Sequence, residues 1–266
     1  MPLRPTCPLF SGKLPASSRA WLARQSKDPY VKARTSHAAR YRSRSAFKLL
    51  ELNEAFHFLD TAHVNTVVDL GAAPGGWSQV VAEKFGWTSW DTQPLGDVPK
   101  RSEGQLRDSN DAQDQGRSPT AWAGTIIAVD LLRMEPIPGV KTVQMDFLSP
   151  QADAHIHALM LDAGGDGKAD VILSDMAANF TGNPTADAHA SLELHKSVFE
   201  FAKRHLRRLK HFAHPGAHEF RKACLKPHFN HVTYHKPKAS RVESAEAYWV
   251  CMGWKGVQPS KPSSTR

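Results

Sequence analysis

The chain has 266 residues, of which 41% are hydrophobic, so it can bury one sizeable core but has little room for two complete domains. Its 34 Lys and Arg outnumber its 26 Asp and Glu, and the resulting net charge of +8 favours an acidic partner such as nucleic acid. No apolar run approaches the roughly 18 residues that span a bilayer, and the three cysteines lack the spacing of a disulfide framework or a cysteine zinc site.

The amino-terminal end, Met1 to Lys48, is strongly basic, with eleven Lys or Arg and a single acid, Asp28. Residues 1–25 have spaced Arg and Lys, several Ser and no acid, which is typical of a mitochondrial transit peptide. A basic RNA-binding arm has the same composition, so both interpretations stay open. Further along, Arg40, Arg42 and Arg44 are predicted to contact RNA phosphates, and Tyr30 and Tyr41 to stack on bases.

The next three elements are predicted from their apolar patterns. A helical stripe indicates a helix over about Ser45–Leu59, and HVNTVVDLG is typical of a buried parallel strand. GGWSQVVAEKFG then predicts a helix, so a glycine turn joins strand to helix. Residues 88–123 are polar and rich in Gly, Asp, Gln, Ser and Pro, which predicts a disordered insertion.

Three more strands are predicted, each ending near an aspartate. GTIIAVDLL ends in Asp130, VKTVQMDF near Asp146, and ADVILSDMA in Asp175. A long helix is predicted over His189–Lys210, and FNHVTYHK and AYWVCMGW predict an antiparallel hairpin at the sheet edge. We therefore expect one α/β domain over 26–256, with helices on both faces of a mainly parallel sheet, and a loose tail over 257–266.

The glycine turn VVDLGAAPGGWSQ favours a nucleotide-like ligand, because glycines let the backbone approach a ligand at the amino end of a helix. The alternative is a tight turn with no ligand. The spacing of Gly71, Gly75 and Gly76 departs from the dinucleotide pattern G-x-G-x-x-G, so a dehydrogenase fits poorly.

The aspartates at the strand ends sharpen this interpretation. Asp130 follows the second strand, where a carboxylate would bind two ribose hydroxyls of an adenosine-containing ligand, and Asp146 would lie by the adenine edge. Either one could instead be the N-cap of a helix.

Together with IIAVDLLRMEPIPGV, MDF and LSDMAANFTG, the glycine turn resembles the FtsJ family of ribosomal RNA 2′-O-methyltransferases, over about Ser26 to Lys255. Within that family the chain is most similar to the members that methylate a uridine of mitochondrial large-subunit rRNA. The resemblance implies a Rossmann-like doubly wound sheet and S-adenosylmethionine as cofactor, bound at Gly75, Trp77, Asp130, Asp146 and Asp175. It also implies a Lys, Asp, Lys, Glu catalytic set at Lys48, Asp175, Lys210 and Glu246.

Such a set suits the chemistry, because a ribose 2′-hydroxyl is a poor nucleophile that must be positioned and deprotonated. A lysine accepts that proton only in its neutral form, which burial and a nearby cation favour. Lys48 and Lys210 would supply this arrangement if they lie close together, and Asp175 and Glu246 would orient the amines and the hydroxyl.

The sequence departs from the family in one place. Family members have a pattern like GGxFVxK before the second lysine, whereas FEFAKRHLRRLKHF passes from a basic helix to Lys210 without a glycine turn or an apolar strand. We therefore expect the fifth strand to be shortened or missing. Either a few residues around Leu206–His211 leave the helix as a substitute strand, or the chain is unstable and inactive, since buried strands need backbone partners.

The predicted function is methylation of a ribose 2′-hydroxyl in ribosomal RNA, in the free RNA or the large ribosomal subunit, within the mitochondrial matrix. Two alternatives remain: a tRNA 2′-O-methyltransferase, and an RNA-binding ribosome assembly factor with impaired catalysis. We expect a monomer without membrane association. His211, His214 and His218 are closely spaced, but no cysteine pattern accompanies them, so no metal site is predicted.

Overall fold

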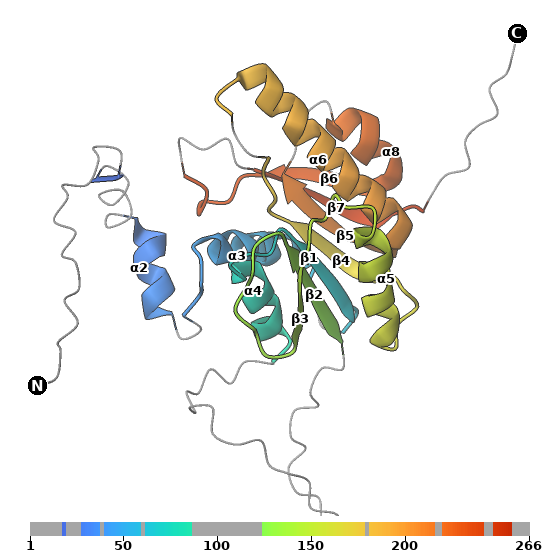
Figure 1. The fold of residues 1–266 in the computed structure, drawn as a ribbon, viewed down its shortest axis with the longest axis horizontal. Coiled ribbons are helices and arrows are strands. Elements are labelled where there is room, and N and C mark those ends of the chain that lie inside the picture. Colours follow the sequence, from blue (N-terminus) through green and yellow to red (C-terminus); the bar gives the residue numbers. More distant parts are fainter. Residues whose placement is uncertain are drawn as a thin grey trace, which may run out of the picture.

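The computed structural model describes residues 18–19, 28–37, 40–59, 62–86, 124–178, 181–215, 220–241 and 247–256, with only the backbone for 208–215. Seven strands form one sheet: β1 Thr66–Leu70, β2 Thr125–Asp130, β3 Val140–Gln144, β4 Ala169–Ser174, β5 Leu206–Pro215, β6 Phe229–His235 and β7 Tyr248–Trp254. Their order across the sheet is β3-β2-β1-β4-β5-β7-β6 (Figure 1). This arrangement matches the doubly wound sheet that the sequence predicts.

Strands β1 to β5 are parallel, so their carboxyl ends meet at one edge of the sheet. β1 lies in the middle and is buried along its whole length, between β2 and β4. Its run of apolar and β-branched residues suits a strand covered on both faces. The prediction of a mainly parallel sheet, and of these first four strands, is confirmed.

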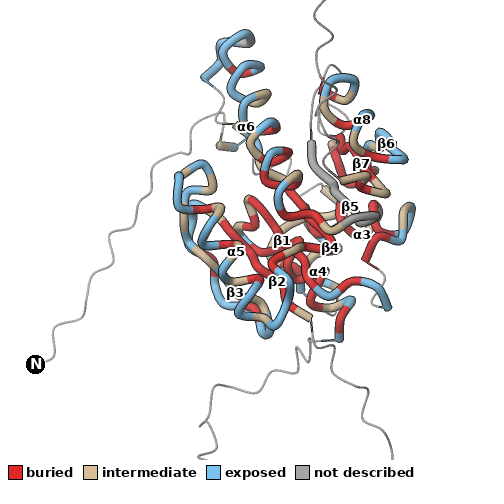
Figure 2. The backbone as a smooth tube through the Cα atoms, turned by 90° about the vertical axis from the view of Figure 1, so that its right-hand side faces the viewer, coloured by how far each residue is buried: buried red, intermediate tan, exposed pale blue. Residues whose placement is uncertain are grey.

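Helices cover both faces of the sheet. On one face lie α3, Ser45–Phe56, and α4, Gly76–Lys84; on the other lie α5, Ala152–Asp162, and α6, Pro184–His205 (Figure 1). Apolar side chains alternate along β1, because Val67 packs with α3 and α4 whereas Val68 and Leu70 pack with α5 and α6. Figure 2 shows the buried strands between helices whose outer sides are exposed. The predicted helices at 45–59 and 75–86 are confirmed.

The expectation of a shortened or missing fifth strand is wrong, because β5 is ten residues long. It takes the last five residues of the helix predicted over His189–Lys210, since α6 ends at His205. β5 pairs with β4 on one side and with β7 on the other, so the backbone groups of all three strands have partners. A helix at this place would leave the facing edges of β4 and β7 unpaired. The substitute-strand alternative is therefore confirmed.

The pairing of β5 with β4 is irregular at its start. Ala169 pairs with Leu206, but Val171 pairs with His211, so two steps along β4 correspond to five steps along β5. Regular pairing extends from His211 to Ala213. Residues 207–210 thus lie in a bulge, outside the regular ladder.

The closing hairpin is confirmed as antiparallel, although β7 inserts between β5 and β6 so that β6 forms the sheet edge. A π-helical turn, η1 Arg221–Leu225, and a short helix, α8 Lys226–His228, precede β6. Before α3 lies α2, Pro29–Ser36, whose N-cap Asp28 accepts a hydrogen bond from the Tyr30 backbone. In the described part of the chain, no helix is both long and apolar enough for a transmembrane span. Apart from 18–19, the predicted transit peptide, insertion and tail lie outside the described residues.

Candidate active site

The glycine turn lies between the carboxyl end of β1 and the start of α4. The backbone amides of Gly71 and Ala72 donate to the Val129 carbonyl, at 2.9 and 3.1 Å, so the turn is anchored to β2. Gly75 has φ 108°, and a Cβ there would lie 2.9 Å from Ile137 Cδ1. Both the backbone conformation and the close approach therefore require glycine at this position.

Arg42 fastens this turn to the neighbouring loop. Its guanidinium donates to the backbone carbonyls of Pro74, Glu135 and Pro136, at 3.3, 2.5 and 2.7 Å. Its backbone amide also donates to Gln79 Oε1, on α4, at 2.7 Å. Arg42 thus stabilises the turn through contacts within the protein, whereas the sequence predicted that its guanidinium contacts RNA phosphates.

The other members of the predicted RNA cluster also have partners within the protein. Arg44 pairs with the Asp28 carboxylate and donates to the Ala239 carbonyl. Tyr41 is 2% exposed, with its hydroxyl bonded to Glu83, so its ring is not available to stack on a base. Of the three arginines only Arg40 presents an exposed side chain, and the prediction of an arginine cluster open to RNA is corrected accordingly.

Asp130 and Asp146 lie at the carboxyl ends of β2 and β3, as predicted. Asp130 accepts hydrogen bonds from the amides of Ala73 and Leu132, at 2.8 and 2.7 Å, and Asp146 accepts one from the Leu148 amide at 2.9 Å. Neither is a helix N-cap; for α5 that residue is Gln151. Each carboxylate oxygen has two lone pairs, so Asp130 can still accept hydrogen bonds from ligand hydroxyls.

Beside these carboxylates the surface is apolar, because Leu131, Leu132 and Leu148 are 66%, 66% and 57% exposed. Exposed leucines next to hydroxyl-binding carboxylates can cover the faces of an aromatic base. The carboxyl ends of β2 and β3 therefore fit an adenosine group.

Asp69 lies deeper, within β1, and is 1% exposed. Its Oδ2 accepts a hydrogen bond from the Ser78 hydroxyl at 2.7 Å, whereas Oδ1 has no hydrogen-bond partner among the described residues. Burial raises the pKa of this carboxyl to about 7; the nearby Asp175 and Asp130 also raise it, while the Ser78 hydrogen bond opposes the shift.

Lys48 and Asp175 come together at the carboxyl end of β4, as the resemblance implies. Lys48, on α3, is 6% exposed, and its Nζ lies 3.5 Å from Asp175 Oδ2. The hydroxyl of Tyr248, the first residue of β7, donates to Asp175 Oδ1. Lys48 Nζ also lies 5.8 Å from the centroid of the Tyr248 ring. We call Lys48, Asp175 and Tyr248 the Lys–Asp–Tyr cluster.

Trp77 packs against this cluster through Tyr248. Its ring packs 5.5 Å from that of Tyr248, and its Nε1 donates to the Ser45 carbonyl at 2.8 Å. The residue is only 2% exposed. In the geometry seen here Trp77 acts by holding α3 and β7 together, and its direct contact with a cofactor stays a prediction.

The register does not bring Lys210 to this cluster. Lys210 immediately precedes His211, which pairs with Val171, whereas Asp175 lies four steps further along the chain from Val171. At about 3.3 Å per residue this is roughly 13 Å along the strand. Glu246 lies outside the described residues, two positions before Tyr248, so its predicted role stays a prediction.

Tyr248 is the site residue that the sequence analysis missed. Its place in AYWVCMGW indicates only a strand, and its hydroxyl partner, Asp175, is 73 residues away in the chain. Only the sheet order, which places β7 beside β5, brings the two together. Within the described residues, no group of three or more His, Cys, Asp or Glu side chains is placed to hold a metal ion.

Comparison with known proteins agrees with this geometry. The family described as FtsJ-like methyltransferase matches residues 41–254. The ribosomal RNA large subunit methyltransferase E of Rhodopseudomonas palustris (strain HaA2) is 38% identical over 255 residues, covering 94% of this chain and 90% of that protein. The protein of the same name from Azorhizobium caulinodans is 39% identical over 245 residues, covering 91% and 85%.

A solved structure is also similar to this one. It is described as a ribosomal RNA methyltransferase from Plasmodium falciparum and superposes with a TM-score of 0.58 at 26% identity. The match covers 82% of this chain and 100% of that chain.

Proposed function

Because the chain belongs to the FtsJ-like methyltransferase family, we propose that it methylates a ribose 2′-hydroxyl of large-subunit ribosomal RNA, using S-adenosylmethionine. The names of the bacterial relatives support the RNA substrate. The observation that carries the proposal is the Lys–Asp–Tyr cluster, which places a buried amine and a carboxylate beside the glycine turn.

The residues around the glycine turn fit the cofactor. Asp130 would accept the ribose hydroxyls, and the exposed leucines beside Asp130 and Asp146 would cover the adenine. When bound, the cofactor supplies a sulfonium methyl that is already activated for in-line attack.

The chain's own residues would then prepare the nucleophile. A 2′-hydroxyl at the carboxyl end of β4 lies within reach of Lys48 and Asp175, which are 3.5 Å apart. Lys48 would take up the hydroxyl proton as the new O–C bond forms, while Asp175 orients the lysine amine. Tyr248 fixes the carboxylate by its hydrogen bond, and its ring faces Lys48 and excludes water from one side.

Two finer parts of the proposal rest on less. A uridine target follows only from the family resemblance. A mitochondrial location follows only from the composition of residues 1–25, and the two large subunit methyltransferase E proteins compared above are bacterial. The roles of Lys210 and Glu246 as the remaining catalytic residues likewise follow only from the family resemblance.

A second candidate function is an RNA-binding assembly factor that retains the fold without methylating. One observation favours it: the register of β5 keeps Lys210 away from the Lys–Asp–Tyr cluster. The two functions differ in one measurable quantity, the transfer of a methyl group.

The test is transfer of labelled methyl from S-adenosylmethionine to protein-free large-subunit rRNA, to assembled large subunits and to tRNA. We expect label in rRNA, at a nucleotide that becomes resistant to alkaline cleavage because its 2′-oxygen is blocked. Label in tRNA alone would favour the tRNA alternative. Cofactor and RNA binding without any transfer would favour the assembly factor.

Lys210→Ala, measured in the same assay, tests the catalytic set. The backbone register of β5 favours an unchanged rate, whereas a catalytic Lys210, as the resemblance implies, predicts a loss. A loss of about a hundredfold or more, the usual effect of removing a group that acts in proton transfer, would mean that the lysine reaches the site in the complex with RNA.

A further inference from the structure

The segment from Phe220 to Arg241 is unusually basic. It contains six Lys or Arg and three His, and no Asp or Glu. It forms η1, α8 and the edge strand β6, and the side chains of Lys222, Lys226 and Lys238 are exposed. The surface formed by these three elements and the residues after β6, up to Lys238, is called the β6 face below.

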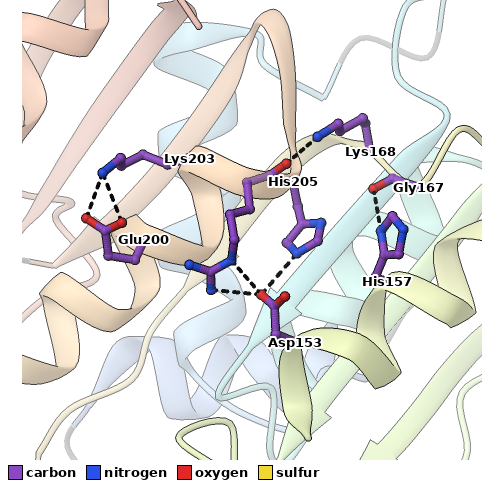
Figure 3. A network of polar contacts seen from close by, with 8 residues as sticks. Asp153, His157, Gly167, Lys168, Glu200, Lys203 and His205 are labelled. Carbon is purple, nitrogen blue, oxygen red and sulfur yellow. Dashed lines mark hydrogen bonds and ion pairs between the residues drawn. The ribbon is translucent and has the colours of Figure 1, made fainter. Parts of the chain in front are cut away.

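The basic residues of α6, in contrast, are paired with acids. On α6, Lys196 and Lys203 pair with Glu193 and Glu200, at 2.8 and 2.9 Å, and Arg204 pairs with Asp153 of α5 at 2.8 Å. Figure 3 shows Lys203 between the two oxygens of Glu200, and Asp153 bonded to His205. Because of this network, α6 presents paired positive and negative charges to the solvent, whereas the β6 face presents mainly positive ones.

Among the described residues, acids from other elements contact the β6 face only near its carboxyl end. Glu51, on α3, accepts hydrogen bonds from the backbone amides of Lys238 and Ala239, and Asp28 lies 3.7 Å from Arg241. Both carboxylate oxygens of Glu200 are hydrogen-bonded to Lys203, as described above. The contacts of Glu51 and Asp28 lie at the carboxyl end of the segment, so Lys222 and Lys226 keep their positive potential.

An aromatic ring is exposed on β6, on the side of the strand that packs against Trp249. Tyr234 is 54% exposed, and its ring packs 5.0 Å from that of the buried Trp249. The guanidinium of Arg221 lies 5.2 Å from the same Trp249 ring, and Arg221 Nε has no hydrogen-bond partner in the described part of the chain. Trp249 thus holds an exposed ring and a cation in fixed positions, which suits stacking on a base beside a phosphate.

A hollow follows the outer side of β6. It has a volume of about 400 Å³ and is lined by Lys226, Asn230, His231, Thr233 and Lys255, among others, with no carboxylate in its wall. Polar donors and cations without acids are the lining that a phosphate backbone requires.

The β6 face begins at the active site. His235, the last residue of β6, pairs with Tyr248 of the Lys–Asp–Tyr cluster, and β6 runs from there towards the opposite end of the sheet. Seven strand residues extend about 20 Å. An RNA strand with one ribose at the cluster could therefore continue along this edge.

We infer that the β6 face is a second RNA-contact surface, on which lysines bind the phosphates of the strand that leaves the active site and Tyr234 stacks on one of its bases. This inference rests on the proposed function for the identity of the RNA. It assigns substrate binding to the closing hairpin, which the catalytic proposal uses only through Tyr248.

The experiment measures affinity of the full chain for a labelled large-subunit rRNA fragment over a range of KCl concentrations. In the variant Lys222→Gln, Lys226→Gln, Lys238→Gln, we expect the slope of log affinity against log salt to fall by about 2 to 3, because each lost phosphate contact removes about 0.7 to 0.9. The matched control, Lys196→Gln, Lys203→Gln, Arg204→Gln, removes the same charge from α6 and should leave the slope close to that of the wild type.

Variants of Tyr234 distinguish the contribution of base stacking to RNA affinity from that of charge. Tyr234→Ser should weaken RNA binding about five- to hundredfold, whereas Tyr234→Phe, which keeps the ring, should bind as the wild type does. Affinity for S-adenosylmethionine, measured by calorimetry, should be unchanged in all of these variants.

The outcomes distinguish this inference from the proposed function. A wild type that methylates rRNA together with β6-face variants that bind normally would overturn the inference alone, as would an equal loss in the α6 control. A wild type that binds rRNA through the β6 face but transfers no methyl would overturn the proposed activity and support the surface. Lost binding to assembled large subunits with normal binding to protein-free rRNA would assign the surface to a ribosomal protein, against the inference.

Discussion

The two ends of the central sheet each bury a carboxylate, and they hold it in opposite ways. At the amino end, Asp170 of β4 accepts hydrogen bonds from the amides of Asn65 and Thr66, at 2.7 and 3.0 Å, and lies 3.1 Å from the Arg207 guanidinium. Near the carboxyl end, Asp69 of β1 accepts hydrogen bonds from Ser78, and one of its oxygens has no partner within the described residues.

The difference separates stability from function. The amino end satisfies its buried charge and ties two strands together, whereas the carboxyl end leaves a buried carboxylate poorly compensated beside the glycine turn and the Lys–Asp–Tyr cluster. Polar groups left in such a state are a cost to folding, and they gather at sites where ligands bind. Four measurements test this contrast, in order of the expected effect.

The largest effect is expected for Lys48→Met. Loss of the amine should lower the rate of methyl transfer about 10²- to 10⁴-fold, because a positioned proton acceptor contributes this much. Single-turnover transfer to rRNA at saturating cofactor measures it. Lys84→Met, an exposed lysine on α4, is the control and should keep its rate; a Lys48 variant that also keeps its rate would remove the cluster from the mechanism.

The next effect is the pH dependence of stability that Asp69 imposes. Its pKa of about 7 in the folded chain lies above the value of about 3.9 expected when unfolded, so the folded state binds this proton more tightly. The associated stability is fully present below about pH 4 and is lost as the pH rises through about 7, on the order of 4 kcal/mol in total.

Asp69→Asn removes this titration. The variant should therefore exceed the wild type in free energy of unfolding by a few kcal/mol at pH 8 and by much less at pH 4.5. Urea unfolding at both pH values measures the two differences. A variant less stable than the wild type at pH 8 would contradict the view that this carboxylate is a cost to folding.

The amino end should respond in the opposite direction. Asp170→Ala leaves two backbone amides without their acceptor and Arg207 without its buried partner, so we expect a loss of about 3 kcal/mol in unfolding free energy with little effect on cofactor binding. Asp166→Ala is the matched control, because Asp166 pairs with the same arginine on the surface and should contribute less than about 1 kcal/mol. Equal losses in the two variants would refute the contrast.

The smallest effect is expected for Tyr248→Phe, which keeps the ring against Trp77 and removes the hydrogen bond to Asp175. Loss of one hydrogen bond to a charged acceptor, about 1.5 kcal/mol, should lower the methyl-transfer rate about tenfold. The KM for rRNA should change little. A Phe variant with full activity would show that Lys48 alone orients Asp175.

The sequence predicts the amino-terminal half of the sheet well for a physical reason. The strands that contain Val67 and Ile126 are buried on both faces, which requires apolar runs in the sequence. These runs, and the glycine turn between strand and helix, therefore predict the fold from local sequence alone. Only the resemblance of their motifs paired Lys48 with Asp175, which lie 3.5 Å apart in the structure, because no local pattern distinguishes a buried lysine from an exposed one.

The carboxyl-terminal half is harder to predict because tertiary contacts decide it. LRRLKHFAHP has no apolar alternation, and becomes a strand because β4 and β7 need a partner between them. The roles of Arg42 and Tyr248 likewise depend on partners far away in the chain, such as Pro136 and Asp175. A composition that is typical of RNA binding thus turned out, at Arg42, to be internal bracing.

That brace has a consequence for the order in which ligands bind. One guanidinium joins the segment before α3 to both sides of the proposed cofactor site, at Pro74 and at Glu135 and Pro136. An RNA that moves this segment must also move the glycine turn, and a cofactor that tightens the turn must stiffen the segment. Such coupling is reciprocal by thermodynamic necessity, so whatever factor the cofactor adds to RNA affinity, RNA adds to cofactor affinity. If both ligands bind as proposed, we expect Arg42 to couple their affinities, although they need never touch the same side chain.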